Sequence, residues 1–269
     1  MMARMATPSD LSPPSAVLEA FDLDSRSLER ATSGLINPTW YVRSNAGTSL
    51  VLQRVSPIFP PVVNLDILAV TDHLTRKGLL TPRLVPAKSG APWLDHEGSV
   101  WRTLTRIDGV CRDAIGSAAQ ARAAGAIVAE FHRAVADLDY TFQNARPGVH
   151  DTPRHLKNLR LALVEHASHR DIGAIAPLAE RVLALAAALP PLPPCPDRIV
   201  HGDLKISNLM FAKDTDRALC LIDLDTLSRM PIALELGDAL RSWCNPTTED
   251  AKDATFRRDY FDAAVRGYA

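Results

Sequence analysis

The chain has 269 residues, 46% of them hydrophobic, so it is long enough to bury a substantial core as one large domain or two smaller lobes. Its 30 basic and 31 acidic residues leave a formal net charge of -1, which creates no overall field that would attract nucleic acid or an anionic membrane. We therefore expect neither as a partner, and any phosphate binding must be local.

The amino terminus and the cysteines favour a cytoplasmic protein. No long apolar segment follows the first residues as it does in a signal peptide, and the longest apolar run, "VLALAAALPPLPP", is short and broken by prolines. The four cysteines have neither C-x-x-C nor metal-ligand spacing. Scattered cysteines of this kind suit reduced thiols in the cytosol better than a disulfide framework.

The first part of the chain predicts a small antiparallel β lobe with one helix. Residues 1–15 are rich in Ser, Pro and Met and predict a disordered tail. After a short amphipathic helix in "SAVLEAFDL", the β-forming stretches 39–44 and 49–55 flank "NAG", a hairpin signal. Residues 61–78 show helical spacing and a Lys-Gly end, and residues 84–107 predict a second small β pair. We assign this lobe to residues 16–108.

The second part of the chain predicts a mainly helical lobe, residues 109–269, which makes the fold α+β and bilobal. "LMF" and "ALCLI" predict two short strands around the turn "AKDTDR". Amphipathic helices, several of them rich in alanine and leucine, are predicted in residues 117–138, 155–168, 177–189, 232–243 and 249–268.

Four polar residues flank the predicted hairpin. In "HGDLKISN", Asp203 can accept the proton of an attacking hydroxyl, Lys205 can face a phosphate, and Asn208 can offer a neutral oxygen to a divalent ion. Asp223, in "CLIDLDT", adds a carboxylate, and Mg²⁺ prefers one or two carboxylates with substrate phosphates and water. A lone H-x-D would be read as a capping or turn aspartate. The spacing H-x-D-x-x-x-x-N, followed by a hairpin and I-D, coincides instead with the catalytic loop and metal-binding aspartate of kinases and indicates phosphoryl transfer.

These motifs resemble those of the aminoglycoside phosphotransferase and choline kinase superfamily, small-molecule kinases with the protein-kinase-like fold. Within it, "YVRSNAGTSLVLQRVSPIFPPVVNL", "VPAKSGAPWLDHEGSVWRTLTRIDG", "HDTPRHLKNLRLAL" and "IDLDT" followed by "LGDALR" are together similar to the N-acetylhexosamine 1-kinases. The similarity runs from about residue 30 to the end of the chain. It implies transfer of the γ-phosphate of ATP, with Mg²⁺, to a small molecule, the anomeric hydroxyl of GlcNAc or GalNAc.

The resemblance also implies roles for individual residues. Asp203 is the expected catalytic base, with Lys205 beside it, and Asn208 and Asp223 are the expected Mg²⁺ ligands. The segment from Arg102 to Ile107 is the expected hinge whose backbone meets the adenine. Further nucleotide contacts are expected in "GLINPTWYV", where an ordinary β-turn is the alternative. The nucleotide-binding candidates in these two segments are Arg102, Thr103, Leu104, Thr105, Asn37 and Thr39.

The sequence departs from the kinase pattern in the predicted sheet. "LVLQRV" stands where V-A-I-K would carry the phosphate-pairing lysine, so Gln53 or Arg54 replaces it. The two residues point to opposite faces of a strand, and the register favours Gln53, with Lys205 supplying the positive charge. The N-acetylhexosamine kinases also tolerate glutamine there. The helix at 61–78 offers Asp66 and Asp72 but no glutamate, so the usual lysine–glutamate pair cannot form.

Additional polar residues lie near the motifs. Asp225 is a candidate for orienting the sugar or a water molecule, and Asp238 is expected to bind loop backbone or an arginine such as Arg241. His201 is expected to support the loop through packing and hydrogen bonds. The kinases that the chain resembles continue with further helices beyond "YFDAAVRGYA", so we expect part of the acceptor pocket to be missing or supplied elsewhere.

Two alternative functions stay open at this point. The same chemistry could serve another acceptor, such as an aminoglycoside, choline or another sugar, although the aromatic content of 6% argues mildly against choline. A non-catalytic nucleotide-binding protein is suggested by the missing lysine, while the joint presence of Asp203, Asn208 and Asp223 weighs against it. The sequence does not decide between ATP and GTP or fix the oligomeric state.

Overall fold

The computed structural model describes residues 12–31, 36–144, 149–247 and 253–269. The chain forms two compact units, one made of Met1–Ala145 with Arg198–Ala269 and the other of Arg146–Asp197. Most of the predicted tail, and residues 34–35 of "GLINPTWYV", lie outside the described residues. The first unit contains every residue predicted to act in the site.

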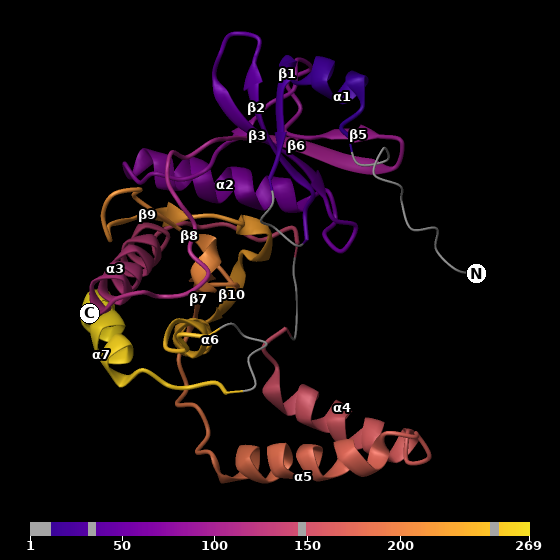
Figure 1. Cartoon of the computed structure of the whole chain (residues 1–269), viewed down its shortest axis with the longest axis vertical. Helices are drawn as coiled ribbons and strands as arrows, with labels where there is room; N and C mark the ends of the chain where they lie inside the picture. Colours follow the sequence, from indigo (N-terminus) through magenta and orange to yellow (C-terminus); the bar gives the residue numbers. More distant parts are fainter. Residues whose placement is uncertain (1–11, 32–35, 145–148, 248–252) are drawn as a thin grey trace. The chain divides into compact units, whose positions relative to one another are not determined.

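A six-stranded antiparallel sheet forms the first part of this unit (Figure 1). The strands follow the order β1-β2-β3-β6-β4, and β5 pairs with β6. The hairpin predicted around "NAG" is confirmed, because β2 and β3 pair with Trp40 opposite Leu52. The strands are β1 (Leu23–Arg30), β2 (Thr39–Ser44), β3 (Ser49–Val55), β4 (Leu84–Val85), β5 (Leu94–His96) and β6 (Ser99–Thr105).

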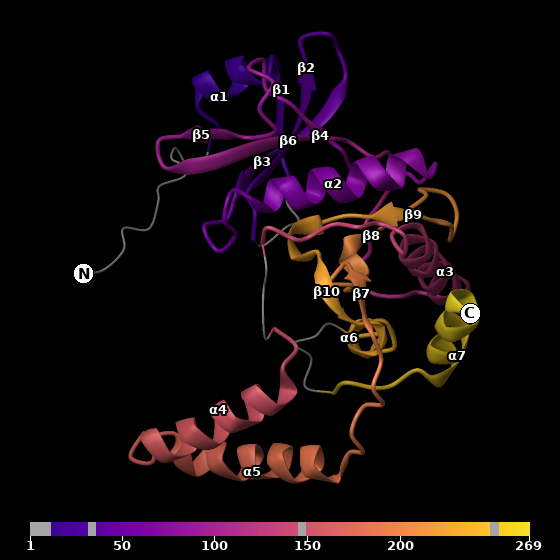
Figure 2. The ribbon, with the colours of Figure 1, turned by 180° about the vertical axis from the view of Figure 1, so that it is seen from behind.

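The two faces of the sheet pack into different cores because side chains alternate along each strand. One face contributes Trp40, Leu52 and Trp101 to a small core beneath α1 (Ser15–Ala20). The other face contributes Val55 and Leu104 to the main core, which continues into helix α2 (Val63–Arg76) and the helical part. Both views place α2 between the sheet and the hairpin that follows Asn208 (Figures 1 and 2). This second face therefore looks toward the predicted catalytic loop.

The helical part of the first unit carries the predicted catalytic hairpin. Strands β8 and β9 pair antiparallel, with Leu209 opposite Leu221. Two further short strands, β7 and β10, form a two-stranded sheet that the sequence did not predict. The elements are α3 (Ala118–Ala134), β7 (Asp197–Val200), β8 (Leu209–Phe211), β9 (Ala218–Leu221), β10 (Ser228–Pro231), α6 (Ile232–Trp243) and α7 (Arg258–Tyr268).

Helices α3 and α7 lie side by side at unusually close range (Figure 1). A Cβ on Gly125 would lie 2.0 Å from the backbone oxygen of Ala264, and a Cβ on Gly267 would lie 2.0 Å from that of Arg122. Only glycine allows the two backbones to approach so closely. The helix predicted over 249–268 begins only at Arg258, and residues 249–252 of that prediction lie outside the described residues.

The second unit consists of α4 (Thr152–Glu165) and α5 (Ile172–Ala188). The side chain of Asp151 accepts a hydrogen bond from the Arg154 amide at 3.0 Å and caps α4, because it satisfies one of the free N–H groups at the start of a helix. Helix α4 buries no residue and α5 buries only Ala179. This unit therefore has almost no core of its own.

The observed architecture confirms the predicted α+β fold with an antiparallel amino-terminal sheet. All four cysteines are free, with Cys220 and Cys244 buried. Within the described residues, no helix is both long enough and apolar enough to cross a membrane.

Candidate active site

The backbone of the loop that carries Asp203 is fixed by His201. The imidazole Nε2 lies 2.8 Å from the Ile222 oxygen, and Nδ1 accepts a hydrogen bond from the Asp203 amide at 3.3 Å. Since a neutral imidazole donates from one nitrogen and accepts at the other, these partners select the tautomer protonated on Nε2. His201 is fully buried, so it supports the loop rather than reaching a substrate.

Gly202 brings the loop against the turn that follows β9. Its φ is +83°, and a Cβ there would lie 2.3 Å from the Thr226 oxygen. The Gly202 amide donates to Glu235 Oε1 at 2.7 Å, and the Thr226 hydroxyl donates to the His201 oxygen at 2.8 Å. Glu235 of α6 thus binds the loop backbone, while Asp238 binds Arg241, one of the two partners expected for it.

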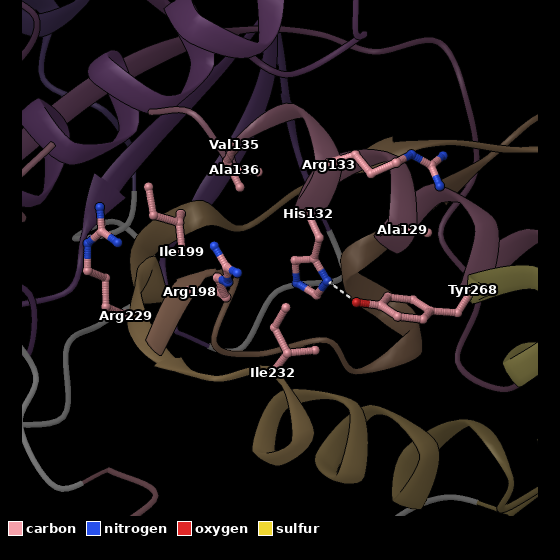
Figure 3. Close-up of a pocket in the computed structure, with 10 residues that line it drawn as sticks. All are labelled: Ala129, His132, Arg133, Val135, Ala136, Arg198, Ile199, Arg229, Ile232 and Tyr268. Atoms are coloured by element: carbon pink, nitrogen blue, oxygen red, sulfur yellow. Dashed lines mark hydrogen bonds between the residues drawn. The ribbon is translucent and has the colours of Figure 1, made fainter. Parts of the chain in front are cut away.

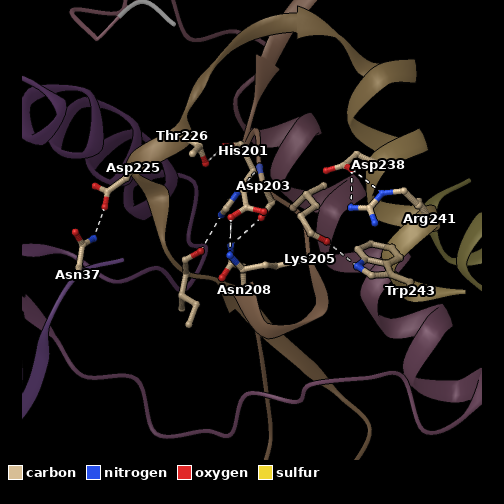
Figure 4. Close-up of polar contacts among 12 residues, drawn as sticks. Asn37, His201, Asp203, Lys205, Asn208, Asp225, Thr226, Asp238, Arg241 and Trp243 are labelled. Atoms are coloured by element: carbon tan, nitrogen blue, oxygen red, sulfur yellow. Dashed lines mark hydrogen bonds and ion pairs between the residues drawn. The ribbon is translucent and has the colours of Figure 1, made fainter. Parts of the chain in front are cut away.

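Asp203, Lys205 and Asn208 are brought together as the motif predicts (Figure 4). Lys205 Nζ donates to Asp203 Oδ2 at 2.9 Å, and Asn208 Nδ2 donates to the same oxygen at 3.0 Å. The Asp203 side chain is 28% exposed, whereas Asn208 is buried. The loop therefore presents one carboxylate to solvent and fixes its orientation through one of its two oxygens.

Asp223 lies at the same end of the hairpin as Asn208. The Ile222 amide donates to the backbone oxygen of Asn208 at 2.9 Å, and Asp223 follows directly in the left-handed conformation, with φ +62°. Burial, and then the neighbouring Asp225 carboxylate, raise the pKa of Asp223, while Lys205 and Arg102 oppose this change. A nearby divalent cation would favour the ionised form of such a carboxylate.

The donor set fits Mg²⁺ better than a transition metal. No group of three or more His, Cys, Asp or Glu side chains that could hold a metal occurs in the described part of the chain. Asn208 turns its amide nitrogen toward Asp203, which leaves its oxygen, together with the Asp223 carboxylate, as the donor atoms. Few protein oxygens completed by water and phosphate are typical of Mg²⁺ sites.

Three polar side chains form a row across neighbouring strands of the sheet. Thr39 lies opposite Gln53, and Gln53 lies opposite Arg102. Gln53 donates to the Thr39 hydroxyl at 3.2 Å and accepts from Arg102 Nε at 2.9 Å. Gln53 therefore points to the face of the sheet that looks toward the catalytic loop. The buried cation of this row, Arg102 on β6, therefore stands one strand away from Gln53 on β3, the position where kinases carry their lysine.

Arg102 does not present its side chain to a nucleotide as part of a hinge. Its guanidinium forms a bidentate ion pair with Asp225, through Nη1 at 2.5 Å and Nη2 at 2.9 Å. The two side chains are 2% and 1% exposed. Asp225, which we expected to orient the sugar or a water molecule, is enclosed by protein donors, and a contact with the acceptor stays a prediction.

The predicted hinge also lies within a strand. Thr103 and Leu104 are flanked by β3 on one side and β4 on the other, and Thr105 exchanges hydrogen bonds with Arg83. Sheet pairing thus uses the backbone of Thr103 and Leu104 on both sides, and contact of the segment Arg102 to Ile107 with adenine stays a prediction. The segment that crosses to the helical part begins after Thr105.

This crossing segment is bonded to the catalytic hairpin. Val110 and Phe211 exchange backbone hydrogen bonds of 2.8 and 2.9 Å. A Cβ on Gly109 would lie 2.6 Å from Cγ of Met210, so glycine is required for the close approach. The contact joins the sheet to the loop that carries Asp203.

Asn37 connects the start of β2 to the turn after β9. Its Nδ2 donates to Asp225 Oδ2 at 2.6 Å, and its Oδ1 accepts from the Ser56 amide at 2.7 Å. The side chain is therefore held between two protein segments. The two expectations for this segment, a nucleotide contact and a simple β-turn, did not include this arrangement. Its contact with a nucleotide stays a prediction.

The two acids of α2 are bound to other parts of the protein. Asp66 accepts from the Tyr140 hydroxyl and from the amides of Gln143 and Asn144, each at 2.8 Å. Asp72 lies 3.6 Å from the Arg83 guanidinium near the surface. Neither takes the place of the kinase glutamate. The contact of α2 with the sheet cation is made by Asn64, whose oxygen accepts from Arg102 at 3.3 Å.

A cavity of about 290 Å³ lies between α3, β7, β10 and the end of α7 (Figure 3). None of the predicted site residues lines it. His132 and Tyr268 lie in its wall with 2.8 Å between Nδ1 and the hydroxyl, and His132 Nε2 lies 2.5 Å from Glu235. The cavity thus borders the support of the catalytic loop and not its reactive side.

The sequence did not predict the buried ion pair of Arg102, which was expected only as part of the hinge, or the role of Glu235. The signal for Arg102 is a charged residue within the otherwise apolar strand "SVWRTL", which requires a buried partner. Glu235 gave no comparable signal, because Asp238 follows three residues later and is equally acidic. In the structure Asp238 pairs with Arg241 at 3.0 Å.

Comparisons with known proteins bear on the family and the fold of the chain. The model of a phosphotransferase enzyme family matches residues 27–269. An amicoumacin kinase, solved with AMP-PNP, Ca²⁺ and Ami, is 14% identical with a TM-score of 0.69, over 94% of this chain and 75% of that one. A microcompartment-associated aminopropanol kinase is 19% identical with a TM-score of 0.61, over 94% and 78% of the two chains. A macrolide 2'-phosphotransferase from Brachybacterium faecium is 17% identical with a TM-score of 0.58, over 94% and 80%. These structures confirm the kinase-like fold.

Proposed function

The chain belongs to the phosphotransferase enzyme family, and on that premise we propose that it is a Mg²⁺-dependent kinase that transfers the γ-phosphate of ATP to a hydroxyl group of a small molecule. The observation that carries this proposal is the hydrogen-bonded set Asp203, Lys205 and Asn208, with Asp223 at the same end of the hairpin. Phosphoryl transfer relies mainly on positioning and on neutralising charge, and this set supplies groups for both.

Asp203 is the proposed catalytic base. Lys205 and Asn208 both hold Oδ2, so Oδ1 is the oxygen that accepts the proton of the acceptor hydroxyl as it attacks the γ-phosphorus in line. Lys205 lies close enough to neutralise charge on a phosphate after nucleotide binding, because its Nζ is already at the reactive side of the loop. A positioned base of this kind contributes about 10²-fold to 10⁴-fold to the rate.

Asn208 and Asp223 are the proposed ligands of Mg²⁺. The ion, when bound, neutralises the charge of the transferred phosphate. Thr39 and Gln53 stay the predicted contacts of the sheet with the phosphates, and Asn37 stays a predicted contact near them. In this proposal residues 16–108 bind the nucleotide, and residues 109–269 carry the catalytic loop.

The finer proposal concerns the acceptor. The sequence resemblance supports the anomeric hydroxyl of an N-acetylhexosamine as the acceptor. The names of the structural relatives support a second candidate, another hydroxyl compound, because they include an aminopropanol kinase and phosphotransferases of antibiotics. The two candidates share the base and the metal ligands and differ only in the pocket that recognises the acceptor.

The deciding experiment is ADP release from Mg-ATP with a panel of GlcNAc, GalNAc, simple hexoses, aminopropanol and an aminoglycoside. We expect turnover with one acceptor class and a decrease of about 10²-fold to 10⁴-fold in kcat for Asp203→Asn. Asp214→Asn, in the exposed turn of the hairpin, is the matched control and should keep wild-type turnover. Undiminished activity of Asp203→Asn would exclude the proposed base. Turnover of aminopropanol but not of the sugars would replace the sugar proposal.

A further inference from the structure

The buried ion pair between Arg102 and Asp225 joins two distant parts of the molecule. Arg102 belongs to β6, and Asp225 lies 123 residues later, in the turn that follows Asp223. Asn37 donates to the same carboxylate at 2.6 Å, while Gln53 and Asn64 accept from the guanidinium at 2.9 and 3.3 Å. Two residues therefore donate to the Asp225 carboxylate, and two more, from β3 and α2, hold the guanidinium that binds it.

The contacts use the hydrogen-bonding capacity of both partners. All three nitrogens of Arg102 donate, and both oxygens of Asp225 accept. A guanidinium that is fixed at so many points orients its carboxylate partner, because the planar fork matches the two oxygens. The position of the Asp225 carboxylate is consequently fixed through both of its oxygens.

Asp225 is itself part of the turn that follows Asp223. Residues Leu224–Thr226 form a single 3-10 turn, and Asp223 enters it with φ +62°, a conformation that is uncommon for residues other than glycine, asparagine and aspartate. The other end of the turn is bound to the catalytic loop, through the Thr226 hydroxyl and the His201 oxygen at 2.8 Å. A displacement of Asp225 would therefore be passed to Asp223 on one side and to the catalytic loop on the other.

We infer that Arg102 is a positioning residue that, through Asp225, holds the Asp223 carboxylate in place for Mg²⁺ and ties that carboxylate to the nucleotide-binding sheet. The inference rests on the proposed function, since it assigns a purpose to the pair only if Asp223 binds the metal. It also explains why the buried cation, Arg102, can stand on β6, although kinases carry their lysine at the position of Gln53 on β3. The cation acts on the metal-binding turn through a carboxylate and does not itself need to reach a phosphate.

The test measures binding of Mg-AMP-PNP by titration calorimetry, together with thermal unfolding, and needs no acceptor. Substitution of residues that hydrogen-bond to metal ligands typically lowers metal affinity by about 10-fold to 100-fold. We expect the affinity for Mg-AMP-PNP to fall by that factor in Arg102→Lys, which keeps the charge but not the bidentate guanidinium, and in Asp225→Asn. Binding of AMP-PNP in EDTA should be the same in these variants and in wild type. Lys77→Met, which removes the exposed Lys77–Asp137 pair, is the matched control and should bind normally.

The double variant Arg102→Met with Asp225→Leu separates positioning from stability. Apolar replacement of a buried ion pair often keeps or raises stability, so the double variant should unfold at or above the temperature of the single variants. It should nevertheless bind Mg-AMP-PNP as weakly as they do. Wild-type affinity in the double variant, or in Arg102→Lys while Asp225→Asn is impaired, would overturn the inference. Absence of Mg-AMP-PNP binding in the wild-type protein would instead overturn the proposed function, before any variant is compared.

Discussion

At the scale of single residues, the candidate site depends on backbone conformation as much as on its reactive side chains. Gly202 precedes Asp203 with φ +83°, and Asp223 adopts φ +62°. Both residues lie where the catalytic loop meets the turn after β9. The positions of the two carboxylates are thus set by unusual dihedral angles that the surrounding hydrogen bonds maintain.

Gly202 provides a direct test of this dependence. In Gly202→Ala the added Cβ would meet the Thr226 oxygen at 2.3 Å, in addition to the strain of a positive φ. Overpacking of this kind costs about 1–3 kcal/mol, and the left-handed conformation itself about 1–2 kcal/mol. We expect a loss of unfolding free energy of that combined order, measured by urea denaturation, together with loss of turnover.

Gly90→Ala is the matched control for this substitution. Its φ is +86°, but nothing lies within 4 Å of the added Cβ. It should show only the conformational cost and keep full activity. If Gly202→Ala were no more destabilised than Gly90→Ala, the close approach of the loop and the turn would have no energetic importance.

The sequence predicted the motif residues and the supporting role of His201, but not the supports that come from distant segments. Asp203, Lys205, Asn208 and Asp223 were predictable because their spacing is local and bracketed by a hairpin. The pairing of Arg102 with Asp225 was not, since the partners are 123 residues apart and only the folded sheet brings them together. The sequence therefore offered Asp225 only as a residue that orients the sugar or a water molecule and could not reveal its pairing with Arg102.

At the scale of elements, the packing of α3 against α7 supports the catalytic part. Glycines at the crossing allow backbone contact, as Gly125 lies against Ala264 and Gly267 against Arg122. Just beyond the crossing, Tyr268 of α7 contacts His132 of α3, which in turn contacts Glu235 beneath the catalytic loop. Disturbance of this helix pair should therefore reach the site through Glu235.

Gly125→Ala tests the helix crossing. The Cβ would meet a backbone oxygen at 2.0 Å, so the helices must separate, and we expect a net destabilisation of about 1–3 kcal/mol despite the better helix propensity of alanine. Gly237→Ala in α6, where nothing lies within 4 Å of the added Cβ, should instead stabilise by about 0.4–1 kcal/mol. Urea denaturation of both variants measures the difference. A stabilised Gly125→Ala would show that the close crossing does not exist in solution.

Most elements followed from periodicity, and those that did not have weak local patterns. The helix at 232–243 and the strands at 39–44 and 49–55 coincide with the observed bounds. Strand β1 was not predicted, because "LDSRSLER" has few β-forming residues and becomes a strand by pairing with β2. Strands β7 and β10, of four residues each, exist through their mutual pairing.

At the scale of the whole molecule, the two compact units differ sharply in how much they bury. Helix α3 buries nine residues along its length, whereas α4 buries none and α5 only Ala179. Helical stability in proteins comes mainly from tertiary packing of one face, and regions with few buried contacts open at low free energy. The unit Arg146–Asp197 should therefore unfold locally while the rest of the chain remains native.

Hydrogen exchange measures this difference without any variant. We expect the amides of α4 and α5 to exchange at least about 100-fold faster than those of α3, because the former open locally and the latter require opening of the main core. Addition of Mg-AMP-PNP should slow exchange in the catalytic loop and leave α4 and α5 unchanged, since the ligand stabilises only the unit that binds it. Equal protection of α4, α5 and α3 in the free protein would mean that the second unit is covered by another surface in solution. In that case its exposed apolar residues, among them Leu178 and Leu185, would be the first positions to examine by substitution.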